Sequence, residues 1–352
     1  MVGPQVRRLP TMGGPASEPR IVVDAVWKVF GARCDEALAM SREGVGRSDV
    51  LEATGCTVGV RDVSFEVLPG ETFVVMGLSG SGKSTLVRCL SGLTDVTAGS
   101  VRIDGDDVTS MSSSQLRALR RSKLSMVFQH FGLFPHRRVI DNAAFGLEVQ
   151  GVSKVDRRAR ALEVLEIVGL AGFEQHYPQQ LSGGMQQRVG LARAIAVDPE
   201  VLFFDEPFSA LDPLIRRDMQ DELVRLQDRL QRTLVFITHD FAEAIKLGDR
   251  IAIMKDGVFD QIGSAAELIR SPATDYVREF VRDIPKTKVL TARDVMQVGE
   301  GGEQRVHADV VVEHLLPRLL SSDSVLDVID DSGRSIGVVD RAAVVALLEE
   351  QV

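Results

Sequence analysis

The sequence predicts an α/β protein, in which a sheet with a parallel core and an antiparallel margin carries an inserted helical subdomain. A smaller α+β domain is predicted at the C-terminal end. Short apolar runs alternate with helical patterns from Ile21 onward, which is typical of buried parallel strands covered by helices. Between about residues 130 and 200 the strand signals stop and helical spacing replaces them. Near residue 284 the composition shifts, and two more short strands follow.

The predicted core strands are short, apolar segments separated by helical patterns. They are Phe73–Met76, Leu124–Phe128, Val201–Phe204, Leu234–Ile237 and Ile251–Met254. Gly257 and Gly263 bracket a further short strand and predict a terminal hairpin at the sheet margin. In the inserted segment, one helix face is predicted by the i, i+3, i+4, i+7 spacing of Ala161, Val164, Leu165 and Val168.

Three regions are predicted along the chain. Residues 1–19 are rich in Pro, Gly and Arg without any period, so we expect a disordered tail. Residues 20–283 hold the α/β core with its helical subdomain at about 130–200. Residues 286–352 form the separate α+β domain, with predicted strands Val325–Ile329 and Ile336–Val339 around a turn.

Composition excludes several classes of function. The 352-residue chain is 44% apolar and 26% charged, as folded globular proteins are. Its formal net charge of -9 disfavours nucleic acid as a partner, because phosphate backbones attract basic surfaces. No apolar run approaches the roughly 20 residues of a membrane span, and no signal-peptide core is present, so we expect a cytoplasmic chain. Cys34, Cys56 and Cys89 lack metal-site spacing and are expected to be reduced packing residues.

A phosphate-binding loop is predicted at Gly77–Ser84, because GLSGSGKS fits the pattern G-x-x-x-x-G-K-[ST] between a predicted strand and a helical run. In this motif, backbone N–H groups and a helix N-terminus converge on the phosphates of a nucleotide. Lys83 is expected to neutralise the β- and γ-phosphates and Ser84 to ligate Mg²⁺. The expected ATP-binding residues of this segment are Gly77, Ser79, Gly80, Ser81, Gly82, Lys83, Ser84 and Thr85.

Two adjacent carboxylates, Asp205 and Glu206, follow the predicted strand Val201–Phe204. Ligands of open α/β sheets bind at the carboxyl ends of the strands, so this pair lies where a ligand is expected. Asp205 is predicted to hold Mg²⁺, directly or through water, and Glu206 to act as general base on the attacking water. The alternative is that both carboxylates cap a solvent-facing turn.

The segment Leu181–Arg188, LSGGMQQR, resembles the signature LSGGQ of the ABC (ATP-binding cassette) ATPase family, and the resemblance covers roughly residues 21–283. It implies a P-loop NTPase fold with a RecA-like core, and ATP hydrolysis. It further implies a homodimer in which Ser182, Gly183 and Gly184 open a helix facing the γ-phosphate of the opposite subunit. Met185 departs from the usual Gln, but the Ser hydroxyl and backbone donors remain, so activity is expected to survive.

Other family elements occur in the expected order. The resemblance implies that Gln129 links Mg²⁺ and water to the helical subdomain, and that Asp212 couples the two nucleotide sites. His239 is expected to contact the γ-phosphate and to position Glu206 and water. The implied catalytic residues are Glu206, His239 and Gln129. The implied Mg²⁺ ligands are Ser84, Gln129 and Asp205.

An aromatic residue that stacks on adenine is also implied by the resemblance. Phe30, just ahead of Gly31, matches this position, and Trp27 is the competing choice. Base–aromatic stacking contributes about 1–3 kcal/mol. The alternation with Val29 does not decide between the two, because Trp27 can instead pack in the sheet.

An insert at about 32–58 makes Phe30 and Gly77 lie 47 positions apart, farther than in ordinary importer ATPases. It resembles an insert in the ATPase subunits of glycine betaine/proline/choline importers. The segments Met76–Gly82 and Phe208–Arg216 resemble the corresponding segments of the same group. This predicts a subunit that powers the import of compatible solutes. One alternative is an importer of another solute, such as an amino acid, a polyamine or a sulfonate. A soluble ABC ATPase acting on DNA or ribosomes is the other, and the acidic charge balance disfavours it.

The tail, with Thr291–Met296 and the strand–strand–helix run Val325–Leu348, resembles one repeat of a cystathionine-β-synthase-type (CBS) regulatory domain. A single repeat either pairs across the dimer or is a remnant without a regulatory role.

The transporter interpretation implies further partners. They are transmembrane permease subunits, with a cytoplasmic helix docking at His130–Glu148, and an extracytoplasmic substrate-binding protein acting through the permease. The subunit is then expected at the cytoplasmic face of the membrane, with ATP and Mg²⁺ as cofactors.

Overall fold

The structure, a computed structural model, describes residues 18–129, 131–299, 302, 304–321 and 325–349. Most of the predicted tail, residues 1–17, and His130 of the predicted docking segment lie outside the described residues. The described chain divides into two compact units at residues 260 and 261. The predicted extent of the domains, 20–283 and 286–352, stays a prediction.

A six-stranded sheet forms the core of the first unit, with strand order β10-β9-β3-β8-β7-β6. The pairs β9/β3, β3/β8, β8/β7 and β7/β6 are parallel, and β3, β7 and β8 are buried along their whole length. The strands are β3 (Thr72–Met76), β6 (Leu124–Val127), β7 (Val201–Asp205), β8 (Thr233–Thr238), β9 (Arg250–Lys255) and β10 (Val258–Gly263). The predicted parallel core is thereby confirmed. Burial on both faces explains why its strands read as continuous apolar runs.

A second, four-stranded sheet is antiparallel, in the order β2-β1-β4-β5. Its strands are β1 (Ile21–Phe30), β2 (Thr57–Val67), β4 (Ala98–Ile103) and β5 (Asp106–Asp107). Helix α3 (Lys83–Leu90) contacts β1 and β2 of this sheet and β7 and β8 of the other. Leu86, Val87 and Leu90 are fully buried there, so the helix that follows the phosphate loop is a central element of the core.

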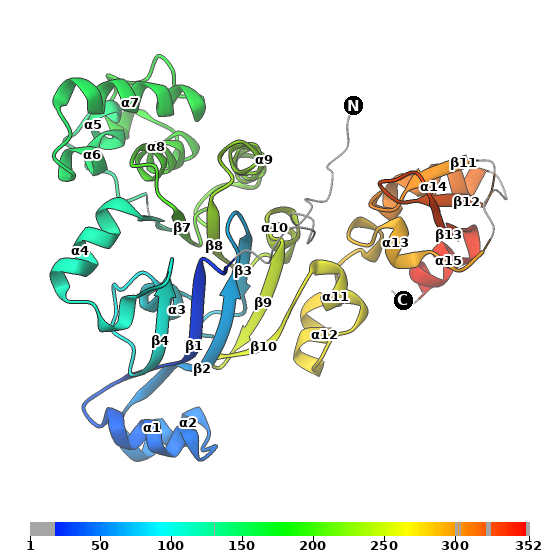
Figure 1. Cartoon of the computed structure of the whole chain (residues 1–352), viewed down its shortest axis with the longest axis horizontal. Coiled ribbons are helices and arrows are strands. Elements are labelled where there is room, and N and C mark those ends of the chain that lie inside the picture. The colour runs from blue at the N-terminus through cyan, green and yellow to red at the C-terminus, as the bar shows by residue number, and fades with distance from the viewer. Residues whose placement is uncertain (1–17, 130, 300–301, 303, 322–324, 350–352) are drawn as a thin grey trace. The chain divides into compact units, whose positions relative to one another are not determined.

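Four helices form the predicted helical subdomain between β6 and β7, as Figure 1 shows in green. They are α5 (Val139–Ala143), α6 (Phe145–Val149), α7 (Lys154–Ile167) and α8 (Gly183–Ala196). The predicted face Ala161, Val164, Leu165 and Val168 is fully buried. The remaining helices of the unit outside the 32–58 insert are α4 (Ser113–Ser122), α9 (Pro213–Leu230), α10 (Phe241–Leu247) and the short 3₁₀ turns Val108–Ser110 and Pro178–Gln180.

The predicted insert folds as two helices, α1 (Cys34–Arg42) and α2 (Arg47–Thr54), between β1 and β2 (Figure 1). Ala37 and Val50 are fully buried in an apolar cluster with Trp27 and Val29 of β1. The insert is therefore packed on the antiparallel sheet through a small core of its own.

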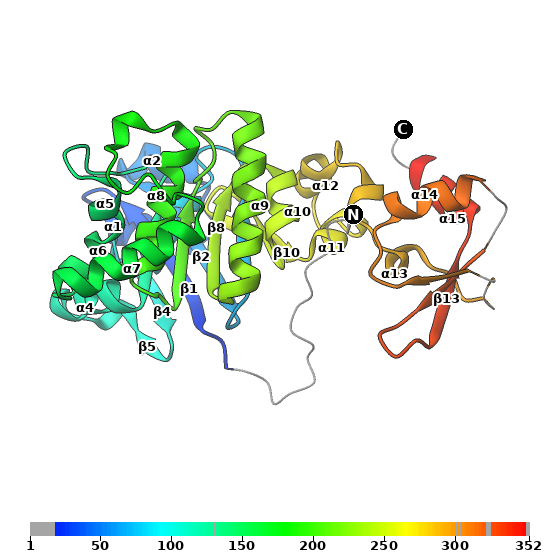
Figure 2. The same ribbon diagram turned by 90° about the horizontal axis from the view of Figure 1, so that it is seen from above.

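The second unit contains a three-stranded sheet with order β11-β12-β13, in which β11/β12 is parallel and β12/β13 antiparallel. Figure 1 labels its three strands, and Figure 2 shows β13 and the helices α14 and α15 from above. Its elements are α11 (Ala265–Arg270), α12 (Asp275–Val281), the 3₁₀ turn Lys286–Lys288, α13 (Ala292–Val295), β11 (Gln304–His307), α14 (Val312–Ser321), β12 (Leu326–Ile329), β13 (Ser335–Val339) and α15 (Arg341–Glu349). The two predicted strands are present, but β11 was missed because Val306 is its single apolar residue. The CBS-type resemblance stays a prediction. Within the described residues, no helix has the length and apolarity to cross a membrane.

Candidate nucleotide-binding and hydrolysis site

The parallel register of the sheet brings the predicted site residues to one edge. Met76 pairs with Thr238, and Asp205 pairs with Ile237, so the ends of β3, β8 and β7 are level. The residues that follow these strands start from neighbouring positions at the carboxyl edge. In open α/β sheets this edge is where ligands bind.

The loop Gly77–Gly82 has a backbone that glycine alone adopts without strain at two positions. Gly77 has φ +153° and Gly82 has φ +110°. A Cβ on Gly77 would lie 2.1 Å from the Met254 carbonyl oxygen, and one on Gly82 would lie 2.3 Å from that of Gly59. Both glycines are therefore required by the backbone conformation and by the close approach of neighbouring strands.

Lys83 is folded back over this loop and is almost fully buried, at 5% exposure. Its Nζ donates to the carbonyl oxygens of Gly77, at 2.8 Å, and Leu78, at 3.0 Å. Burial lowers the pKa of Lys83, and the nearby carboxylates of Glu206 and Asp205 oppose that shift. The carbonyl oxygens of Gly77 and Leu78 thus hold the ammonium at the centre of the loop. A bound phosphate would replace these neutral acceptors, because a charged oxygen forms the stronger hydrogen bond with an ammonium.

Ser81 adds a second polar group that suits a ligand. Its buried Oγ has no hydrogen-bond partner within the described part of the chain. Buried hydroxyls are normally hydrogen-bonded, so the unpaired Ser81 hydroxyl suits a hydrogen bond to a phosphate oxygen. Ser79 and Gly80 are exposed, and Ser84 and Thr85 are half-buried at the start of α3.

The Ser84 hydroxyl donates to Asp205 Oδ1 at 2.7 Å. A hydroxyl and a carboxylate in contact supply the hard oxygen donors that Mg²⁺ prefers, so the residues fit this ion. Gln129 follows β6 and is exposed. No hydrogen bond between Gln129 and Ser84 or Asp205 is formed in the described chain, so its predicted place among the Mg²⁺ ligands stays a prediction.

Glu206 and His239 are in contact, with 3.2 Å between Glu206 Oε2 and His239 Nδ1. Glu206 also lies 3.9 Å from the ammonium of Lys83. Its backbone has φ +47°, in the left-handed region that residues other than glycine rarely adopt. The Glu206 N–H donates to the Ile237 carbonyl at 3.1 Å, which helps to hold this conformation. Strained backbones of this kind cluster at functional sites.

The segment from Phe208 to Asp212 is held by Arg216, to which the sequence analysis assigned no role. Arg216 donates from Nε to the Phe208 carbonyl at 3.3 Å and from Nη2 to the Leu211 carbonyl at 3.2 Å. Its Nη1 lies 3.7 Å from Asp240, the residue after His239. Asp212 accepts from the Ile215 N–H at 3.1 Å and caps α9.

Ser182, Gly183 and Gly184 form the N-terminus of α8, as predicted. Ser182 is the exposed N-cap and accepts from the Met185 N–H at 3.3 Å. A Cβ on Gly184 would meet Ile215 Cγ2 at 2.4 Å, so α8 approaches the first turn of α9 closely. Within the described residues, no hydrogen bond joins this N-terminus to the loop Gly77–Gly82. The predicted action of the signature on another subunit's nucleotide stays a prediction.

The two adenine-stacking candidates differ in exposure. Phe30 is 43% exposed at the end of β1, whereas Trp27 is 6% exposed and belongs to the apolar cluster of the insert. The Phe30 ring lies beside Gly59 and Thr85, since an added Cβ on Gly59 would meet Phe30 Cε2 at 3.0 Å and Thr85 Cγ2 at 3.1 Å. An accessible ring next to α3 favours Phe30 as the stacking residue.

One further residue touches the phosphate loop. Arg47, the first residue of α2 in the insert, donates from Nη1 to the Gly80 carbonyl at 3.1 Å. No motif in the sequence pointed to it, because the contact joins two segments whose pairing depends on the packing of the insert.

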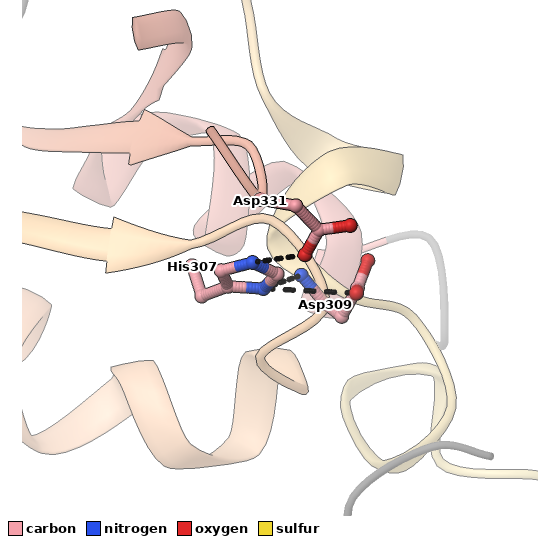
Figure 3. A group of neighbouring side chains, drawn as sticks. All are labelled: His307, Asp309 and Asp331. Atoms are coloured by element: carbon pink, nitrogen blue, oxygen red, sulfur yellow. Dashed lines mark hydrogen bonds and ion pairs between the residues drawn. The ribbon is translucent and has the colours of Figure 1, made fainter. Parts of the chain in front are cut away.

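A separate cluster of one histidine and two aspartates lies in the second unit. His307, Asp309 and Asp331 lie together between the end of β11 and the β12–β13 turn (Figure 3). His307 Nε2 lies 3.1 Å from Asp331 Oδ1, and the Asp309 N–H donates to His307 Nδ1 at 3.3 Å. Both ring nitrogens are therefore satisfied within the protein, and the cluster is explained as a link between loops.

Comparisons with known proteins match this geometry. The family described as ABC transporter matches residues 60–209. The glycine betaine transport ATP-binding protein OpuAA of Bacillus subtilis is 56% identical over 281 residues, which is 80% of this chain and 67% of that protein. The trimethylamine N-oxide transport system ATP-binding protein TmoW of Ruegeria pomeroyi is 50% identical over 339 residues, covering 96% and 98% of the two chains.

A solved structure, the dimeric post-hydrolysis state of the ATP-binding cassette MJ0796 bound to ADP and Pi, has a TM-score of 0.58 and 31% identity. It covers 69% of this chain and 98% of that one. These matches agree with the phosphate loop, the Ser84–Asp205 pair and the Glu206–His239 pair. They support the predicted fold and the predicted hydrolysis of ATP. The chain belongs to the ATP-binding proteins of ABC transporters, ATPases that bind ATP, dimerise and work with permease subunits.

Proposed function

We propose that this chain powers an importer of small compatible solutes, the class of glycine betaine, choline and proline. The names of its relatives carry the proposal, because the subunit itself does not touch the solute. A second candidate, trimethylamine N-oxide, is favoured by the alignment with TmoW, which spans 98% of that protein, whereas the alignment with OpuAA spans 67%.

Hydrolysis is assigned to the residues at the sheet edge. Lys83 and the N–H groups of the loop bind the phosphates, and Phe30 stacks on adenine. Glu206 accepts a proton from the attacking water, and His239 holds the Glu206 carboxylate and contacts the γ-phosphate. Ser84 and Asp205, with Gln129, would hold Mg²⁺, which when bound supplies positive charge to the β- and γ-phosphates.

Two copies would form the active unit. Ser182, Gly183 and Gly184 of one copy would face the γ-phosphate held by the other, where the N-terminus of the 14-residue helix α8 favours an anion. Asp212 would couple the two sites. Closure of the dimer on ATP would then drive the permease, and hydrolysis would reset it.

The permease would dock on the helical subdomain. A cavity of about 250 Å³ is lined there by His136, Arg137, Arg138, Asp141, Glu148 and Tyr177. Two aromatic residues of the predicted docking segment, Phe134 and Phe145, lie beneath Arg137, whose guanidinium is 5.4 and 5.1 Å from the two ring centroids. This cavity, called the docking groove below, is therefore charged at its surface. A polar cytoplasmic helix suits it better than an apolar one. This arrangement implies the cytoplasmic face of the membrane, with the substrate-binding protein acting through the permease.

The test is ATPase activity of the chain reconstituted in proteoliposomes with its permease and binding protein. Glycine betaine, choline, carnitine, proline and trimethylamine N-oxide are each titrated, with histidine and spermidine as unrelated solutes. Stimulation by any of the first five solutes supports the proposal and names the solute. Turnover stimulated only by histidine or spermidine would keep the ABC ATPase and reject the proposed solute class.

A further inference from the structure

We infer that the α1–α2 insert is a working part of the nucleotide site, with Arg47 as the residue that positions the phosphate loop. The inference deepens the proposed nucleotide site and rests on it. The match to the ABC transporter family begins at residue 60, after the insert, so it assigns the insert no role.

Arg47 holds the outer side of the loop. Its Nη1 donates to the Gly80 carbonyl at 3.1 Å and lies 4.0 Å from Asp256 Oδ1. The next carbonyl, that of Ser81, accepts from the Gly257 N–H at 2.8 Å. Two consecutive carbonyls of the loop are thus fixed by donors from outside it, one of them charged.

Because peptide groups are planar, these contacts also fix the direction of the N–H groups that face the phosphates. In a trans peptide the C=O and the following N–H point in opposite directions. Fixing the carbonyls of Gly80 and Ser81 outward therefore directs the N–H groups of Ser81 and Gly82 toward the inside of the loop. Those are N–H groups that a phosphate-binding loop uses. The Ser81 N–H already points inward, since it donates to the Leu78 carbonyl at 3.2 Å inside the loop. Loss of Arg47 would remove the outer restraint on this peptide and leave the inner hydrogen bond to hold it.

The insert holds Arg47 rigidly enough for this purpose. Val50, one turn after Arg47, is fully buried against the cluster that includes Trp27 and Val29. Arg33 donates to the Ala53 carbonyl at 2.9 Å and ties the start of α1 to the end of α2. Because β1 ends at Phe30, the same small core supports the proposed adenine-stacking residue and the arginine at the phosphate loop.

The experiment measures ATP affinity by calorimetry in EDTA, and KM and kcat with Mg²⁺, on the full-length chain. Arg47→Ala is compared with Arg47→Lys and with the matched control Arg42→Ala, an exposed arginine at the end of α1 whose side chain forms no hydrogen bond or ion pair among the described residues. We expect Arg47→Ala to weaken ATP binding roughly 3- to 10-fold and to raise KM, with kcat within about twofold, as for loss of one charge-assisted hydrogen bond. Arg47→Lys should recover part of the affinity, because an ammonium still donates to a carbonyl.

Unchanged ATP affinity in Arg47→Ala would overturn the inference. Equal weakening in Arg42→Ala would also overturn it, because loss of any positive charge from the insert would then explain the effect. If Arg47→Ala fails to fold, as judged by its circular dichroism melt, Arg47→Gln decides the question with the same two measurements. Wild type that binds ATP no better than Lys83→Ala would instead reject the proposed nucleotide site, and this inference with it.

Discussion

The Ser84 hydroxyl and the Asp205 carboxylate meet at 2.7 Å across 121 residues of sequence. Ser84 opens the helix that follows β3, and Asp205 ends β7, which is separated from β3 by β8 alone. The contact therefore depends on the parallel strand order that places β3 and β7 on either side of β8. It places a hydroxyl and a carboxylate together beside the buried ammonium of Lys83.

Replacing Asp205 tests this pair as a Mg²⁺ site. We expect Asp205→Asn to lower Mg²⁺-dependent ATP hydrolysis by about 10²-fold or more, because a neutral amide is a weaker ligand for a hard cation. ATP binding measured in EDTA should stay within about threefold of wild type. Hydrolysis with an unchanged dependence on Mg²⁺ concentration would exclude Asp205 as a ligand.

Glu206→Gln tests the general base. Hydrolysis should fall by roughly 10²-fold or more, since an amide cannot accept the proton of the attacking water. ATP binding should persist, and size-exclusion chromatography with ATP should show more dimer than for wild type. Single-turnover hydrolysis at the wild-type rate would remove Glu206 from this role.

Alanine substitutions of Phe30 and Trp27 should affect different properties, ATP binding in the first case and folding stability in the second. Phe30→Ala is expected to weaken ATP binding by about fivefold or more, as for loss of a base stack worth about 1–3 kcal/mol. Its thermal melt should hardly change, because the ring is 43% exposed. Trp27→Ala should instead lower the free energy of unfolding by about 3–5 kcal/mol, as for truncation of a buried aromatic. Weaker ATP binding in Trp27→Ala together with lower stability in Phe30→Ala would make Trp27 the stacking residue and Phe30 the packing residue.

Glu243 should make stability depend on pH. It is 4% exposed on α10 and accepts from Gln220 Nε2 at 3.1 Å. Burial raises its pKa, and hydrogen bonds from Thr238 and Gln220 partly offset the shift. Because the folded pKa lies above the unfolded one, folding disfavours the ionised form. The stability contributed by the protonated carboxyl is full below the unfolded pKa and is lost as pH rises through the folded pKa.

Glu243→Gln should therefore remove the loss of stability that accompanies ionisation of this carboxyl as pH rises. Urea unfolding should give similar free energies for wild type and variant near pH 4, and the variant should become the more stable at pH 8. Each unit of pKa elevation corresponds to about 1.4 kcal/mol. A difference between the two proteins that is constant from pH 4 to 8 would contradict the linkage.

Arg137→Glu tests the docking groove. Arg137 forms a 2.7 Å ion pair with Glu148 and covers Phe134. We expect charge reversal to leave the ATPase activity of the isolated chain intact and to abolish its stimulation by solute in proteoliposomes. A carboxylate at this position would repel Glu148 and would remove the ion pair and the ring contacts that shape the cavity. Arg160→Glu on α7, outside the lining of this cavity, is the control. Coupled transport at the wild-type level in Arg137→Glu would place the permease elsewhere.

Local patterns in the sequence were enough to predict the parallel core, the helical subdomain and the phosphate loop. Phe73–Met76 is apolar throughout because β3 is buried on both faces, and Gly77–Ser84 carries its conformation in its own glycines. The face containing Ala161 and Val164 was recognisable because amphipathic spacing is a property of one helix. In contrast, β11 was missed, since four residues with one buried apolar side chain form no pattern.

The sequence by itself determined which residue types are available for chemistry: a lysine in a glycine loop, adjacent carboxylates, a histidine after a strand. Only the tertiary structure decided which of them touch. The Glu206–His239 contact, the exposure of Phe30 over Trp27, and the reach of Arg47 to Gly80 all join segments that packing brings together. The physical reason is that propensity and periodicity act over a few neighbouring residues, whereas strand order and burial are set by the free energy of the whole core.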